Sequence, residues 1–360
     1  MSKKTFPLSK EQLEEIIKKY PTPFHIYDER AIRENIRKLQ KAFAWAPRFR
    51  EQFAVKALPN PRILQVLHEE GAGTDNSSLA ELVLSEASGY KGEEILLTSN
   101  DTPADEFQKA IELGAIINLD DISHLDYLEK NAGLPKIICF RYNPGDLIEG
   151  NDIIGKPTEA KYGLTRDQLF EAYKMAQEKG VKRFGLHTMV ASNERRTEAF
   201  VFTAKLMFEL AVELKRRLGI HVEFVNIGGG IGIPYRPEEE PVDLEAVGEG
   251  IHKLYDEMMV PEGLGDVAMM TESGRAITGP AGWPRRQSTR RRPTRTTSAS
   301  TPAWPTSCAR PCTALTITSR SRARRTNRAT TSTTSRARSA RTTISSPSTA
   351  SCRRLTSATA

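Results

Sequence analysis

The chain of 360 residues is long enough for two ordinary domains, or for one barrel with an appendage. Its formal net charge of +7 suggests an acidic partner, but the charge is unevenly distributed. Residues 284–360 contain 17 arginines and no Lys, Asp or Glu, whereas residues 1–283 hold 35 basic and 45 acidic side chains. The body is therefore acidic, which argues against a nucleic-acid partner for the whole chain.

Cysteine content and hydropathy exclude further classes. Of four cysteines only Cys139 lies in the body, so no disulfide framework is expected. The N-terminus has no apolar run behind its lysines, and no stretch of 18 apolar residues occurs, which argues against a signal peptide and a membrane span. We expect a cytoplasmic protein.

The first 30 residues are predicted to contribute one strand, Pro23–Tyr27, to a second, β-rich domain, with no helix before it. A helix over Arg30–Phe43 follows. Residues 31–283 then alternate short apolar runs with stretches of helical period, which is typical of β/α units and a parallel sheet. The predicted strands are Gln52–Ala57, Gly71–Ser77, Glu94–Ser99, Ala115–Asp120, Lys136–Tyr142, Arg183–Met189, Val222–Gly228 and Asp266–Thr271.

Amphipathic segments separate these strands. The predicted helices are Pro61–Glu70, Leu79–Ser88, Pro103–Leu113, His124–Asn131, Asp167–Lys179, Glu198–Leu218 and Leu244–Met259. Eight strands with helical crossovers predict a (β/α)8 barrel of the TIM type, with an open doubly wound sheet as the main alternative.

Chemistry in such a barrel gathers at the C-terminal ends of the strands. The polar residues at these ends are Lys56, Asp75, Arg141, His187, the glycines after Ile227, Glu272 and Arg275. They contain the parts of a pyridoxal-phosphate site, and no metal site is expected.

Lys56 lies in the apolar run FAVKA, where burial would lower its pKa and favour the neutral amine that a Schiff base needs. Taken alone, Lys56 is better interpreted as a strand-end lysine that reaches solvent. Gly228, Gly229 and Gly230 would let backbone N–H groups approach a phosphate, although a tight turn is the alternative. The run is not a dinucleotide fingerprint, because it comes late and lacks the acidic partner.

His187 could stack on a cofactor ring or be a structural residue. Glu272 could keep a pyridine nitrogen protonated, so that the ring accepts electrons during decarboxylation. Glu272 and Arg275 could also form a salt bridge at the rim.

Together these motifs resemble the fold-type III pyridoxal-phosphate-dependent decarboxylases, most of all the diaminopimelate decarboxylases, over residues 20–283. The motifs are FAVKA, Gly73-Thr74-Asp75 with Ser77 and Glu81, Arg141-Tyr142-Asn143-Pro144, Gly185-Leu186-His187, the triple glycine and Glu272-Ser273-Gly274-Arg275. Residues 187–193 (HTMVASN) depart from the commoner His-x-Gly-Ser form.

The resemblance implies a role for each residue. Lys56 would hold the cofactor covalently, His187 would stack on its ring and Glu272 would face its pyridine nitrogen. The three glycines, with Ser192, would bind its phosphate. The remaining implied roles are contact of Arg275 with phosphate or substrate carboxylate, and placement of Asp75 and Arg141 beside the lysine and the ring.

The implied reaction is decarboxylation of meso-diaminopimelate to L-lysine by a cytoplasmic homodimer. The alternatives are a sister decarboxylase acting on ornithine, arginine or carboxynorspermidine, and a non-enzymatic pyridoxal-phosphate-binding barrel. A third alternative is a nucleic-acid binder that works through the basic tail.

Residues 284–360 include 33 Ser and Thr and no Gly, Val, Phe, Tyr or Met, as in a disordered low-complexity tail. Basic arms usually contain Lys and Gly as well, so we prefer a one-base shift of the reading frame near Trp283. Shifted back, Ser298–Arg320 and Ala337–Pro347 can encode segments that resemble the family's β-domain, including a Cys-Glu motif. On this hypothesis the tail's arginines have no function, and Cys308, Cys312 and Cys352 form no metal site. The printed chain would then lack most of the β-domain and be inactive or aggregate.

Overall fold

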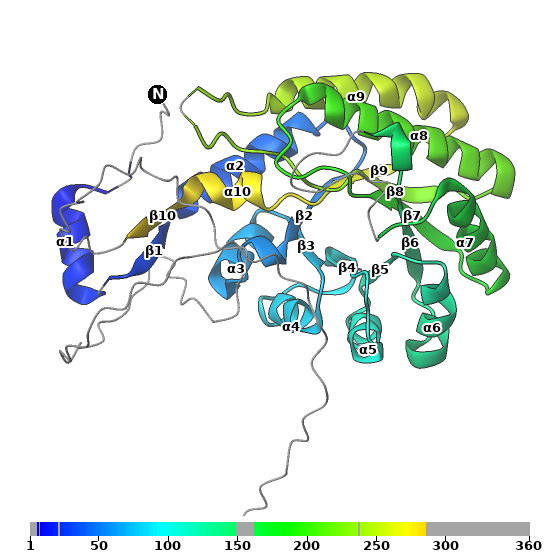
Figure 1. The fold of residues 1–360 in the computed structure, drawn as a ribbon, viewed down its shortest axis with the longest axis horizontal. Helices are drawn as coiled ribbons and strands as arrows, with labels where there is room; N and C mark the ends of the chain where they lie inside the picture. Colours follow the sequence, from blue (N-terminus) through cyan, green and yellow to red (C-terminus); the bar gives the residue numbers. More distant parts are fainter. Residues whose placement is uncertain (1–5, 7, 21, 149–161, 237, 286–360) are drawn as a thin grey trace, which may run out of the picture. The chain divides into compact units, whose positions relative to one another are not determined.

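The computed structural model describes residues 6, 8–20, 22–148, 162–236 and 238–285. Within them, eight parallel strands form a closed barrel and two further strands form a small antiparallel sheet (Figure 1). The predicted tail, residues 284–360, lies outside the described residues except for the strand backbone at 284 and 285.

The barrel strands follow one another around the barrel in chain order, and the last pairs with the first. Their bounds are β2 Phe49–Ala54, β3 Gly73–Asn76, β4 Ile95–Thr98, β5 Ile116–Leu119, β6 Ile137–Tyr142, β7 Arg183–Thr188, β8 Val222–Asn226 and β9 Ala268–Thr271. Closure runs through parallel pairing of β2 with β9, in which Phe49 stands opposite Met269. The predicted (β/α)8 barrel is thereby confirmed, and the open sheet is excluded.

Each crossover carries an α-helix, and α2 before β2 packs against α3 and α9. The helices of this ring are α2 Glu29–Ala42, α3 Pro61–Glu69, α4 Leu79–Ala87, α5 Ala104–Leu113, α6 Ser123–Ala132, α7 Arg166–Glu178, α8 Thr197–Leu218 and α9 Leu244–Met258. Local sequence fixes several ends. Asn60 accepts hydrogen bonds from the N–H groups of Arg62 and Ile63 at the start of α3. Gly114 and Gly219 end α5 and α8 with φ of 68° and 67°.

The lower part of the barrel interior is apolar. Its core contains Leu96, Ile116, Ile137, Cys139, Phe224, Ala268 and Met270. Gly185 on β7 makes room for the ring of Phe224 on β8, because a Cβ at 185 would lie 2.0 Å from Cζ of that ring. A larger apolar cluster fills the space between the strands and the helices. The polar side chains of the predicted site lie beyond this apolar layer, at the C-terminal ends of the strands.

The N-terminal strand β1, Phe24–Tyr27, pairs antiparallel with β10, Gly282–Arg285, which follows the barrel. The expectation that no helix precedes this strand is wrong, since α1 spans Lys10–Lys19. Ser9 and Gln12 form a capping box at its start, although the helix buries none of its residues. The sequence therefore indicates this helix only through its capping residues, and not through an apolar face that packs on a core.

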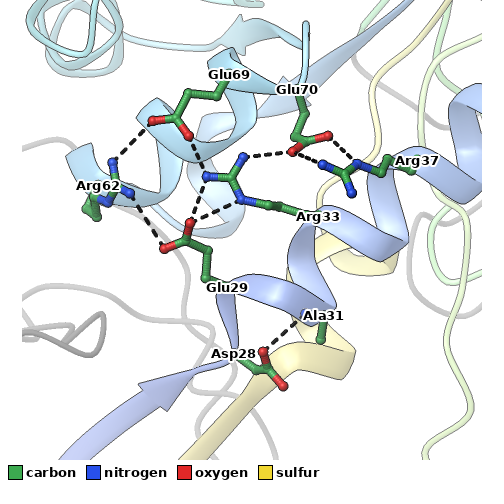
Figure 2. A network of polar contacts seen from close by, with 8 residues as sticks. All are labelled: Asp28, Glu29, Ala31, Arg33, Arg37, Arg62, Glu69 and Glu70. Carbon is green, nitrogen blue, oxygen red and sulfur yellow. Dashed lines mark hydrogen bonds and ion pairs between the residues drawn. The ribbon is translucent and has the colours of Figure 1, made fainter.

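Alternating acidic and basic side chains form ion pairs between α2 and α3, as Figure 2 shows. This α2–α3 charge network consists of Glu29, Arg33, Arg37, Arg62, Glu69 and Glu70. The guanidinium of Arg33 contacts Glu29 and Glu70, each at 2.7 Å, and also Glu69. A hydrogen bond from Arg37 lowers the pKa of Glu70, and one from Arg33 lowers that of Glu69. Glu69 and Glu70 thus each have a guanidinium partner that stabilises the charged form.

Candidate active site

The predicted site residues lie at or just beyond the C-terminal ends of the barrel strands, which meet at one mouth. They are Lys56 in the 3-10 turn η1 (Val55–Ala57), Asp75 in β3, Arg141 in β6, His187 in β7, Ser192 in the loop after β7, Gly228–Gly230 after β8, Glu272 after β9, and Arg275 at the start of α10 (Arg275–Thr278). The fold therefore gathers residues from the ends of six different strands at one mouth.

Lys56 lies beside Asp75 at this mouth. Its Nζ is 3.7 Å from Oδ2 of Asp75, and its side chain is 62% exposed. Because β2 ends at Ala54, Lys56 belongs to the turn and not to the predicted strand Gln52–Ala57. The negative charge of Asp75 raises the pKa of Lys56 and outweighs the effect of burial. The expectation of a lowered lysine pKa is therefore wrong.

Asp75 is a buried carboxyl with an incomplete set of partners. Only 4% of the residue is exposed, and its Oδ1 accepts no hydrogen bond. Burial raises the pKa of Asp75 to about 7, and Glu272 adds to this rise while Lys56 opposes it. The carboxyl of Asp75 therefore titrates near neutral pH.

Glu272 is held in a buried network across the mouth. It contacts Nε2 of His187 at 2.9 Å and accepts a hydrogen bond of 2.8 Å from Nδ2 of Asn226. Asn226 in turn accepts the N–H of Gly228 at 2.9 Å. Burial opposes ionisation of Glu272, but the charges of His187, Lys56 and Arg141 prevail and lower its pKa. Glu272 is thus maintained as a carboxylate.

His187 lies deeper than its predicted stacking role requires. Its second ring nitrogen, Nδ1, is 2.9 Å from Nδ2 of Asn118, so both nitrogens have side-chain partners. The residue is 0% exposed. An imidazole that stacked on a ring at the open mouth would present one face there. These contacts indicate that His187 orients Glu272, while its stacking on a cofactor ring stays a prediction.

The glycine run packs closely against neighbouring loops. A Cβ at Gly229 would lie 2.1 Å from the carbonyl oxygen of Glu272, and one at Gly230 would lie 2.3 Å from that of Ala191. Gly228 and Gly230 have φ of 74° and 88°, which favours glycine. The N–H of Gly229 points to Sδ of Met189 at 3.2 Å, and a thioether is a weak acceptor. This donor is available to a stronger acceptor such as phosphate.

The two arginines of the site have protein partners. Nε of Arg141 donates to Asp120, and its guanidinium lies 4.8 Å from the ring centroid of Tyr162. Arg275 donates to the hydroxyl of Tyr235. Arg141 is thereby fixed on the wall of the mouth, and Arg275 is oriented from α10.

Three polar residues of the site region were not predicted from the sequence. Asn118 and Asn226 are buried partners of the network, and each stands on the inner face of its strand. Glu51 is fully buried and accepts the hydroxyl of Thr271 and, at 2.5 Å, the N–H of Ser273. Burial raises the pKa of Glu51. Glu51 directly precedes the predicted strand Gln52–Ala57, so no sequence signal indicated its burial inside β2.

The residues present fit pyridoxal phosphate by their chemistry. The amine of Lys56 lies at the mouth, where it can react with an aldehyde. The N–H of Gly229 has only a weak thioether acceptor and can donate to a phosphate instead. The carboxylate of Glu272 is held ionised, as a protonated pyridine requires. No group of three or more His, Cys, Asp or Glu side chains suited to a metal occurs among the described residues.

Comparison with known proteins agrees with this reading. Residues 29–279 match the family described as pyridoxal-dependent decarboxylase, pyridoxal binding domain. This chain belongs to the pyridoxal-dependent decarboxylase family. The cofactor predicted from the sequence is the cofactor of that family. In the described part of the chain, no helix is long and apolar enough to cross a membrane.

Individual relatives show how far the likeness extends. The chain is 40% identical over 281 residues to protein TabA of Pseudomonas amygdali pv. tabaci, covering 78% of this chain and 64% of that protein. It is 35% identical over 272 residues to diaminopimelate decarboxylase of Methanothermobacter thermautotrophicus, covering 75% and 63%. The structure of diaminopimelate decarboxylase from M. jannaschii in complex with L-lysine superposes with a TM-score of 0.69 at 26% identity, covering 76% and 65%. The chain thus spans less than two thirds of the length of these relatives.

Proposed function

We propose that this chain binds pyridoxal phosphate and provides the barrel part of an amino-acid decarboxylase whose substrate is meso-diaminopimelate. One observation carries the proposal. The amine of Lys56, the carboxylate of Glu272 and the glycine run occupy the same barrel mouth, and Lys56 lies 3.7 Å from a buried carboxyl. A structural cluster of charges would not need an unpaired acceptor such as Oδ1 of Asp75.

When bound, pyridoxal phosphate supplies an aldehyde that joins amines and a ring that takes up the electrons left by departing CO2. Lys56 would hold the cofactor covalently. The run Gly228–Gly230, through the weakly paired N–H of Gly229, would hold its phosphate together with Ser192, and Arg275 would contact either that phosphate or the substrate carboxylate. Glu272, oriented by His187 and Asn226, would keep the pyridine nitrogen protonated.

The proton on Lys56 is the first one that must move. The charge of Asp75 keeps Nζ protonated, so a proton has to leave before the nitrogen can bond to an aldehyde. Oδ2 of Asp75, 3.7 Å away, holds the ammonium at the mouth, but its pKa of about 7 lies below that of Lys56, so the proton leaves to solvent and not to Asp75. Arg141, fixed by Asp120, would face the same space and favour anionic groups there.

The choice of substrate rests on the relatives named diaminopimelate decarboxylase. A direct test incubates the purified, frame-restored chain with pyridoxal phosphate and meso-diaminopimelate, and measures CO2 and L-lysine. Parallel reactions contain ornithine, arginine or carboxynorspermidine. Lysine formation supports the proposal, whereas faster turnover of another amine assigns the chain to a sister activity. A cofactor spectrum without turnover of any of these substrates would support a binding barrel instead.

We propose further that the active species is a homodimer completed by a β-domain, to which β1 and β10 belong. On this view the printed residues 284–360 arise from a shifted reading frame. Sequencing the locus from independent isolates tests this, because an unshifted frame that encodes the printed tail would refute it. A frame-restored chain should elute as a dimer and exceed the printed chain in lysine formation.

A further inference from the structure

His187 and Met189 both belong to the inner face of the β7 segment, because side chains alternate along a strand. His187 pairs in register with Arg141 of β6 and Asn226 of β8, so it sits at the level of the buried network. Met189, two residues later and just beyond the end of β7, lies one layer nearer the mouth. It is partly exposed, whereas His187 is 0% exposed.

Met189 also touches the glycine run directly. Its Sδ is the acceptor, at 3.2 Å, for the N–H of Gly229. A Cβ at Gly228 would lie 3.1 Å from both Cα and Sδ of Met189. The thioether therefore lies against the backbone donors proposed above for a phosphate. A flexible, polarizable side chain can give up such a contact and turn to another one.

We propose that Met189, and not His187, is the β7 side chain that contacts bound pyridoxal phosphate, and that its thioether leaves the N–H of Gly229 to the phosphate when the cofactor binds. This inference rests on the proposed function. Thioether sulfur packs favourably against aromatic rings, so Met189 can support the pyridine ring. Because a thioether does not titrate, this face of the ring receives no proton from β7.

Residue-resolved methionine oxidation on the full printed chain provides the test. Hydrogen peroxide transfers one oxygen atom to each accessible sulfur and leaves water, and mass spectrometry reports the rate for each methionine. The reaction is run without ligand and with inorganic phosphate, pyridoxal or pyridoxal phosphate. Met258 at the end of α9, also partly exposed but away from the mouth, serves as the control.

With pyridoxal phosphate at ten times its Kd, Met189 should oxidise about tenfold more slowly, as mass action requires for a contact made only in the complex. Met258 should oxidise at an unchanged rate. Inorganic phosphate alone should accelerate oxidation of Met189 by freeing its sulfur from Gly229. If the cofactor binds, as its absorbance shows, and Met189 oxidises at the same rate as before, the inference is wrong while the proposed function stands. Absence of any cofactor absorbance change overturns the proposed function, and this inference with it.

Histidine acylation gives an independent readout. Diethyl pyrocarbonate should leave His187 unmodified with and without cofactor, while His252, whose side chain is 44% exposed, reacts in both states. Acylation of His187 in the free chain that is suppressed by pyridoxal phosphate would restore the stacking role to the histidine.

As a variant test, Met189→Ala should raise the Kd for the cofactor several-fold, and Met189→Leu, which keeps the bulk, should raise it less. Met258→Ala should leave it unchanged.

Discussion

The α2–α3 charge network and the buried Asp75 at the barrel mouth hold carboxyl groups in different surroundings. In the network, guanidinium hydrogen bonds lower the pKa of Glu69 and of Glu70 (Figure 2). At the mouth, burial raises the pKa of Asp75 to about 7, and its Oδ1 has no partner. Charges that hold helices together are paired, whereas the mouth retains a carboxyl that its surroundings do not satisfy.

This difference separates a stabilising role from a chemical one. Removal of a residue from the network should change stability and leave cofactor binding intact. Removal of a charged residue from the mouth should change cofactor chemistry and can even increase stability, because buried unsatisfied charge is costly. Four substitutions examine the two halves of this comparison.

Substitution of Lys56 by Arg should have the largest effect on chemistry. The guanidinium keeps a positive charge beside Asp75 but cannot form the covalent bond, so decarboxylation should fall below detection. Thermal unfolding without cofactor should change little, since the side chain is 62% exposed. Turnover retained by Lys56→Arg would show that the amine is not the attachment point.

Glu272→Gln should lower kcat by roughly 10²–10³-fold, the range seen when one preorganised electrostatic group is removed. The reason is loss of the negative charge that His187 and Asn226 hold in place. Steady-state kinetics on the frame-restored chain provide the measurement, with circular dichroism as the control for folding. A change confined to KM would contradict the proposed role at the pyridine nitrogen.

Asp75→Asn tests the pH dependence. The folded-state pKa of Asp75 is raised from 3.8 to about 7, so the native state binds the proton more tightly than the unfolded chain. Stability contributed by Asp75 is therefore present at about pH 4 and is lost as pH rises toward 7. Urea unfolding should show the Asn variant about 2–4 kcal/mol more stable than wild type at about pH 8, and nearly equal to it at about pH 4. An equal difference at both pH values would contradict the raised pKa.

Arg33→Ala should have the smallest effect, on stability alone. Its side chain is 20% exposed and its partner Glu70 is 8% exposed, so loss of the pair should cost about 1–2 kcal/mol. Lys38→Ala, at an exposed position of the same helix, is the matched control with little expected change. Weaker binding of pyridoxal phosphate by Arg33→Ala would break the division between the two regions.

The barrel was predictable because its pattern is repeated along the chain. All eight strands lie where the apolar runs place them, within three residues at each end. α1 was missed because it buries none of its residues, so only its Ser9–Gln12 capping box identifies it. Trp283 marked the end of the recognisable pattern, and the pairing of β10 with β1 depends on a contact between distant segments.

The site was predictable in its members but not in its electrostatics. The strand ends identified Lys56, Glu272 and the glycine run, because topology alone brings them to one mouth. The sign of the lysine pKa shift depends on the distance to Asp75, which no sequence pattern gives. The depth of His187 likewise depends on register, which places it level with Asn226 and beneath the rim.

The most direct test of the account is covalent trapping of the cofactor on this chain. Borohydride reduction after incubation with pyridoxal phosphate, followed by peptide mass mapping, locates the attachment. We expect one pyridoxyl phosphate group per chain, on the peptide that contains Lys56, and none in Lys56→Arg. Labelling spread over other lysines, or an unlabelled Lys56 at saturating cofactor, would contradict the central claim that this barrel mouth is a pyridoxal-phosphate site.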